Sequence, residues 1–225
     1  MSFVSAITAI ATHPRNPGYG SAHHAFGKAG ILPTTRFCYT VRLILLPQCC
    51  ENEMKIGLFY GSTTCYTEIV AEKIQALIGA DTLELNNIKQ VPLSKMAEYD
   101  ILILGLSTWD FGEIQEDWEA HWDDISQVNL QGKTIAIYGM GDQIGYAEWF
   151  IDAVGMLHEA IAPQQPIRIG FWPSEGYDFI ASKALTEDGE YFCGLALDDE
   201  NQYDLTDQRL NDWVSQILTE IAERL

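Results

Sequence analysis

The chain has 225 residues and a formal net charge of −19 at pH 7, from 13 basic and 32 acidic residues. Such an acidic surface repels nucleic acid and anionic membranes, and it favours basic protein partners. The five cysteines form no CxxC pair, so neither a disulfide framework nor a zinc site is expected, and a reducing, cytoplasmic location fits best.

The first 53 residues differ in composition from the rest of the chain. They contain no acidic residue before Glu51, are rich in Gly, Ala, Ser, Thr, His and Pro, and lack sustained periodicity. Their longest apolar run, from Leu43 to Leu46, is too short to cross a membrane. Three interpretations are open: a targeting peptide, a disordered tail, or translation that begins at Met54. We favour a start at Met54, because the first strand follows it directly, and we expect one domain over 54–225.

From Met54 onward, apolar runs typical of strands alternate with amphipathic helical patterns. We expect strands at 55–60, 82–85, 100–106, 133–138 and 167–171. We expect helices at 67–78, 116–125 and 146–161. A terminal helix carries apolar residues from Leu210 to Ile221 on one face, and we expect Thr206 to cap its N-terminus.

This alternation predicts an α/β fold: a doubly wound five-stranded parallel sheet with helices on both faces. In such folds, ligands bind at the carboxyl ends of the strands, where the strand order reverses. Three loops reach that edge, at 61–67, 107–113 and 139–146. The sequence therefore predicts one ligand site built from these three loops.

The first loop has the composition of an anion site. Its residues, Gly61-Ser-Thr-Thr-Cys-Tyr-Thr67, are small or carry hydroxyl groups and lead directly from a strand into a helix. The free N–H groups and the dipole at a helix N-terminus favour an anion. A nucleoside triphosphate site would place a Lys just before the helix, and this loop has neither Lys nor Arg. A small anionic group such as one phosphate monoester is expected.

The second and third loops supply aromatic side chains. In Ser107-Thr-Trp-Asp-Phe-Gly-Glu113, Trp109 directly follows a buried strand and either stacks on a flat ligand or fills the core. In Gly139-Met-Gly-Asp-Gln-Ile-Gly-Tyr146, three glycines allow close approach of a ligand and Tyr146 offers a second aromatic face. The third loop by itself could be a plain strand-to-helix turn. Together, the three loops predict a site for a planar ring that carries a phosphorylated chain.

On these three motifs the chain resembles the flavodoxin family, and the resemblance extends over 54–225. The match is to the long-chain branch, whose last strand is split by an insert, here 172–192 between 167–171 and 194–197. Cys65-Tyr66 and Trp172-Pro173 look most like the enterobacterial members of that branch. The resemblance implies non-covalently bound FMN and a low-potential one-electron carrier rather than an enzyme.

The resemblance also implies which residues contact FMN. The first loop would hold the phosphate with Ser62, Thr63, Thr64, Cys65, Tyr66 and Thr67. The second loop would contribute Ser107, Thr108, Trp109, Asp110, Phe111 and Gly112, with Trp109 over one ring face and the Asp110–Phe111 peptide beside flavin N5. The third would contribute Met140, Gly141 and Asp142 at the pyrimidine end and Tyr146 over the other ring face. Asp198 would lie near the ribityl chain, as would Asp110.

The sequence departs from the commonest family pattern at two of these positions. Cys65 stands where Gly is usual, so residue 65 must either adopt a conformation that tolerates a side chain or strain the loop. Asp110 stands where Asn is common and adds negative charge near the flavin.

The implied partners are a basic flavoprotein reductase of the flavodoxin/ferredoxin NADP reductase type and redox acceptor proteins, with the chain acting as a monomer. Acidic residues from Glu113 to Asp124 could form the docking surface or simply a solvated helix face. No nucleophile–base pair and no set of metal ligands is recognisable. The alternatives are an FMN-dependent quinone or NAD(P)H reductase of similar fold, a response-regulator-like switch, and a binding module that has lost its cofactor.

Overall fold

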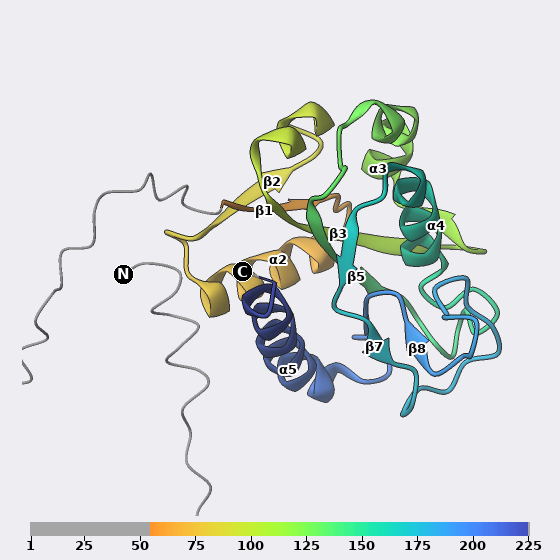
Figure 1. Ribbon diagram of the computed structural model, residues 1–225. Helices are drawn as coiled ribbons and strands as arrows, with labels where there is room; N and C mark the ends of the chain where they lie inside the picture. The colour runs from red at the N-terminus through yellow and green to blue at the C-terminus, as the bar shows by residue number, and fades with distance from the viewer. Residues whose placement is uncertain (1–54, 225) are drawn as a thin grey trace, which may run out of the picture.

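The computed structural model describes residues 55–224, so our interpretations of residues 1–53 lie outside the described part. Six parallel segments build the main sheet: β1 (Ile56–Tyr60), β2 (Leu83–Asn87), β3 (Ile101–Trp109), β5 (Thr134–Met140), β6 (Ile167–Ile169) and β9 (Leu195–Leu197). The strand order is β2-β1-β3-β5-β6, and β9 also pairs with β5 (Figure 1). This order confirms the predicted doubly wound parallel sheet.

The last strand of the sheet is split, as predicted. β6 pairs with residues 134–136 of β5, whereas β9 pairs with residues 138–140 further along the same strand. Between them lies the insert, which forms a small antiparallel pair from β7 (Trp172–Pro173) and β8 (Tyr191–Phe192). β6 and β9 therefore act together as one fifth strand.

Helices cover both faces of the sheet (Figure 1). α2 (Tyr66–Ile78) and α5 (Tyr203–Ala222) lie on one face, where their apolar sides pack in a core with Ile74 and Trp213. The other face is covered by α3 (Glu116–Ala120), α4 (Asp152–Ile161) and three 3-10 helices, η1 (Leu93–Glu98), η2 (Trp122–Gln127) and η3 (Ala162–Gln164). The central strands are buried on both faces, which explains their continuous apolar sequence.

Two expected helices and one expected helix cap were wrong. The helix expected at 116–125 breaks at His121 into α3 and η2. The helix expected at 146–161 begins only at Asp152, because Ile151 adopts a left-handed conformation (φ 48°) that interrupts the turn before it. Thr206 does not cap α5: the helix begins at Tyr203, and the buried Thr206 hydroxyl donates to Asp199 Oδ1 at 2.5 Å.

Candidate functional site

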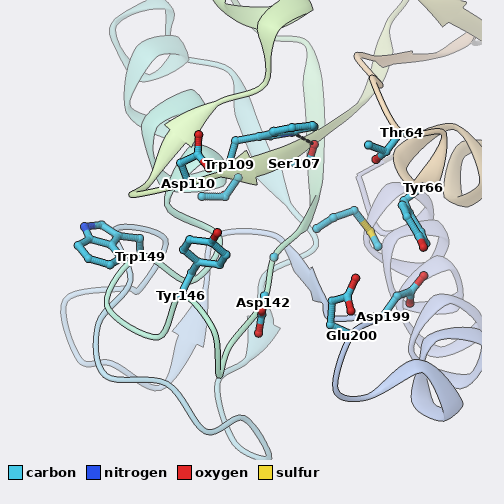
Figure 2. Close-up of a pocket in the computed structure, with 13 residues that line it drawn as sticks. Thr64, Tyr66, Ser107, Trp109, Asp110, Asp142, Tyr146, Trp149, Asp199 and Glu200 are labelled. Atoms are coloured by element: carbon cyan, nitrogen blue, oxygen red, sulfur yellow. Dashed lines mark hydrogen bonds between the residues drawn. The ribbon is translucent and has the colours of Figure 1, made fainter.

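A cavity of about 310 Å³ lies at the carboxyl ends of β1, β3 and β5. Ten of the predicted site residues line it: Thr64, Tyr66, Ser107, Thr108, Trp109, Asp110, Met140, Gly141, Asp142 and Tyr146. Trp149, Asp199 and Glu200 line it as well and were not predicted. Figure 2 shows Trp109 and Tyr146 reaching the cavity from different loops, with Thr64 and Tyr66 across it from Tyr146.

The first loop offers hydrogen-bond donors that have no protein partner. Ser62 Oγ is buried without a hydrogen bond. Within residues 55–224, no N–H group of residues 62–65 donates to a backbone or side-chain acceptor, although Gly61 N donates to Gly105 O. An orphaned buried hydroxyl and unpaired N–H groups at the start of α2 fit an anion such as a phosphate.

Not every residue of this loop faces the cavity. Thr67 is buried inside α2, and its carbonyl accepts a hydrogen bond from Tyr138 Oη at 2.9 Å. Thr63 and Cys65 are exposed on the loop surface. Of residues 61–67, Thr64 and Tyr66 line the cavity and Ser62 does not, while Thr67 anchors the start of the helix.

Cys65 adopts the left-handed conformation, with φ 68° and ψ −9°, at the N-cap of α2. Of the two possibilities left open by the sequence, the structure therefore shows the second: the position favours glycine, and the side chain strains the loop. A left-handed conformation costs a non-glycine residue about 1–2 kcal/mol.

Cys65→Gly is accordingly expected to raise the free energy of unfolding by about 0.5–1 kcal/mol, because the relief of strain exceeds the added flexibility of the unfolded chain. Urea unfolding at equilibrium measures this change. Thr64→Gly is the matched control, since its backbone φ is not positive, and it should lower stability. A less stable Cys65→Gly protein would contradict the strain argument.

Trp109 lies at the end of β3 and forms part of the cavity wall rather than filling the core. Its indole Nε1 donates to Ser107 Oγ at 3.0 Å, and its backbone pairs with Glu113 of β4 (Glu113–Ile114). A tight turn follows, with φ 42° at Asp110 and φ 90° at Gly112. Phe111, at the tip of this turn, is 69% exposed and does not line the cavity.

The third loop and the turns that follow it, up to α4, bring two aromatic side chains to the cavity. Tyr146 is the predicted one, and Trp149 was missed because it lies within 146–161, where we expected a helix that begins only at Asp152. Phe111 packs edge-on against both rings, at centroid distances of 6.5 Å to Tyr146 and 5.2 Å to Trp149. The three rings form one aromatic cluster beside the cavity.

Asp142 organises the same loop. Its Oδ1 accepts hydrogen bonds from the N–H groups of Ile144 and Gly145 and from Asn201 Nδ2. Burial acts to raise the pKa of Asp142, but these hydrogen bonds outweigh burial and hold its pKa below the usual value. Asp142 therefore holds the third loop in place through its hydrogen bonds and also contributes a negative charge to the cavity wall.

Asp198 does not line the cavity. Its side chain is fully buried, and its carboxylate oxygens accept from the N–H groups of Gln143, Glu200 and Asn201 and from two side-chain amides. The next two residues, Asp199 and Glu200, line the cavity instead. The sequence Asp198-Asp-Glu200 does not show by itself which carboxylate is buried and which line the cavity.

The cavity wall is negatively charged. Among the described residues, its lining includes four carboxylates (Asp110, Asp142, Asp199 and Glu200) and no Lys, Arg or His. Such a wall disfavours additional negative charge on a bound ring. Residues 55–224 contain no cluster of side chains suited to a metal ion, and none of their helices is long and apolar enough to span a bilayer.

Comparison with known proteins places this chain in a family. The flavodoxin family model matches residues 58–213. The chain is 55% identical over 170 residues to flavodoxin 2 of Escherichia coli K12, covering 76% of this chain and 98% of that protein. It is 47% identical over 169 residues to a flavodoxin of Synechococcus elongatus, covering 75% and 98% of the two chains.

Solved structures agree with the sequence matches. The crystal structure of Fusobacterium nucleatum flavodoxin bound to flavin mononucleotide superposes with a TM-score of 0.69 at 28% identity, covering 74% of this chain and 98% of that one. The strand order described above is that of the flavodoxin-like doubly wound fold. The chain therefore belongs to the flavodoxin family.

Proposed function

We propose that this protein carries single electrons between redox proteins, with FMN bound non-covalently in the cavity described above. As a flavodoxin it is an electron-transfer flavoprotein, and its redox chemistry is that of the cofactor. The observation that carries the proposal is that one cavity is lined by Thr64, from a loop whose N–H groups at residues 62–65 have no protein acceptor, and by aromatic side chains from two other segments.

The roles of the residues follow from where they lie. Ser62, Thr64 and the N–H groups of the first loop would bind the phosphate. Trp109 and Tyr146 would cover the ring, and the turn at residues 109–112 would lie at its edge. The bound flavin supplies one-electron chemistry; the carboxylates of the wall disfavour its anionic reduced form and so lower its potential.

A quinone or NAD(P)H reductase of similar fold would need room for a second substrate over the ring. Trp109 and Tyr146 line the cavity from two loops and would occupy both ring faces. FMN titration of the cofactor-free protein tests the proposal directly. Binding should quench flavin fluorescence, and the FMN-loaded protein should not oxidise NADPH at a steady rate without a partner.

We further propose that the electron donor is a basic flavoprotein reductase. Glu113 and Glu116 are exposed next to the strand pair that holds Trp109, so they would face such a partner beside the flavin edge. Attraction of this kind speeds encounter and is screened beyond a Debye length of about 8 Å at physiological salt.

Glu113→Lys with Glu116→Lys should therefore lower the bimolecular rate of electron transfer from a basic reductase by roughly tenfold at low salt. Asp117 is left unchanged because it accepts a hydrogen bond from Gln115. The control reverses Asp81 and Asp100, which are exposed at the amino ends of β2 and β3, at the opposite edge of the sheet. Stopped-flow kinetics at several salt concentrations measures the rates. Equal rates for both double variants would show that Glu113 and Glu116 do not form the docking surface.

We propose that the functional domain spans residues 54–225 and acts as a cytoplasmic monomer. The span is supported by the family match at 58–213 and by the 170-residue alignment with the E. coli protein. The location is supported by the cysteine pattern, since the described cysteines, Cys65 and Cys193, are both free thiols.

A further inference from the structure

Two glutamine side chains are almost completely buried beside the cavity without lining it. Gln115 is 0% exposed and Gln143 is 1% exposed. Gln115 follows the second loop and Gln143 lies within the third, and each uses both the oxygen and the nitrogen of its amide. A buried amide that is hydrogen-bonded through both its oxygen and its nitrogen fixes the groups that it joins.

Gln115 joins the first loop to the start of α3. Its Nε2 donates to Thr63 Oγ1 and to Asp117 Oδ2, both at 2.9 Å. Its Oε1 accepts from the N–H groups of Asp117 and Trp118 and so caps α3. A Cβ added at Gly61 would lie 2.2 Å from this Oε1, so the start of the first loop packs directly against the amide.

Gln143 joins the third loop to the segment after β9 and to the insert. Its N–H and its Nε2 both donate to Asp198 Oδ2, at 3.0 and 2.7 Å. Its Oε1 accepts from the N–H of Asp178 in the insert at 2.6 Å. Asn201 Nδ2 extends the network by donating to Asp198 and to Asp142. This network fixes the two walls that carry Asp142 and residues 199–200.

The two networks share no residue and lie behind different parts of the cavity. Gln115 touches the loop with the orphaned Ser62 hydroxyl, whereas Gln143 lies within the loop that carries Tyr146. We propose that Gln115 and Gln143 are positioning residues that set the two ends of the site separately, Gln115 the phosphate end and Gln143 the ring end. This inference rests on the proposed function, because it assumes that FMN occupies the cavity.

The proposal predicts a different pattern for each glutamine when binding of FMN is compared with binding of riboflavin, which has the same ring but no phosphate. Gln115→Met should lower the FMN-to-riboflavin affinity ratio by about tenfold, the equivalent of one displaced hydrogen bond, and leave the absorption spectrum of the bound ring unchanged. Gln143→Met should weaken both ligands by a similar factor of about tenfold. It should also change the spectrum and the one-electron potentials of the bound flavin.

One further variant for each glutamine allows the test to be completed if Gln115→Met or Gln143→Met prevents folding. Thr63→Val removes the acceptor of Gln115 on an exposed side chain, and its effect on the ratio should be non-additive with that of Gln115→Met. Asp198→Asn disrupts the Gln143 network with an isosteric side chain outside the cavity and should reproduce the Gln143 pattern. Circular dichroism and thermal melting of the cofactor-free proteins measure folding separately.

The outcomes separate this inference from the proposed function. A wild-type protein that binds neither flavin would overturn the proposed function. Wild-type binding together with an unchanged ligand ratio in the Gln115 and Thr63 variants, or an unchanged ring spectrum in the Gln143 and Asp198 variants, would overturn only the positioning roles. A uniform loss of both ligands in all four variants, with lower melting temperatures, would show that the glutamines are merely structural.

Discussion

Ser62→Ala combined with Thr64→Val is expected to weaken FMN binding by about 10²–10⁴-fold, whereas riboflavin binding should change by less than about threefold. The loop has no cation, so neutral donors must bind the phosphate alone. Each hydrogen bond to a charged group contributes about 1.5–3 kcal/mol, and the double variant removes two of them. Fluorescence titration of the cofactor-free protein with each ligand measures both affinities.

Ser215→Ala with Thr219→Val is the matched control, because it removes two hydroxyl groups from the exposed side of α5. It should leave both affinities unchanged. An equal loss of FMN and riboflavin in the loop variant would show that Ser62 and Thr64 do not bind the phosphate.

Trp109→Ala is the second change with a large expected effect. It removes the larger of the two ring-covering side chains, and we expect a loss of about 2–4 kcal/mol in FMN binding, or 30- to 1000-fold. Riboflavin should lose the same factor, because the indole contacts the ring and not the phosphate. Both one-electron potentials should shift, since stacking stabilises the oxidation states unequally.

Titration and potentiometry of the Trp109→Ala protein measure these effects, and Tyr146→Ala should act in the same direction. Tyr203→Ala is the control, because Tyr203 is 65% exposed at the start of α5 and does not line the cavity. If the Trp109→Ala protein binds both flavins as tightly as the wild type, the flavin ring does not stack on Trp109.

The sheet could be predicted from the sequence because its strands are buried on both faces. Continuous apolar runs such as 101–106 identify a central parallel strand without knowledge of its neighbours. Parallel strands then place the three following loops at one edge. Ten predicted residues meet at the cavity for this topological reason.

The features that could not be predicted from the sequence depend on contacts between residues far apart in the chain. The conformation of Ile151 delays α4 and turns Trp149 toward the cavity, although the local pattern favours a helix from residue 146. Gln115 and Gln143 look like ordinary polar loop residues, and only the folded chain brings Thr63 and Asp198 to their amides. Asp198 was assigned to the site although its neighbours Asp199 and Glu200 line the cavity.

The proposed one-electron carrier function is tested most directly by the visible spectrum of the FMN-loaded protein during stepwise reduction at known potential. We expect two separate one-electron steps, with a one-electron-reduced flavin accumulating between them and the second step at a low potential because of the acidic cavity wall. A single two-electron step, or a protein that stays colourless with added FMN, would contradict the assignment of this chain as a one-electron carrier.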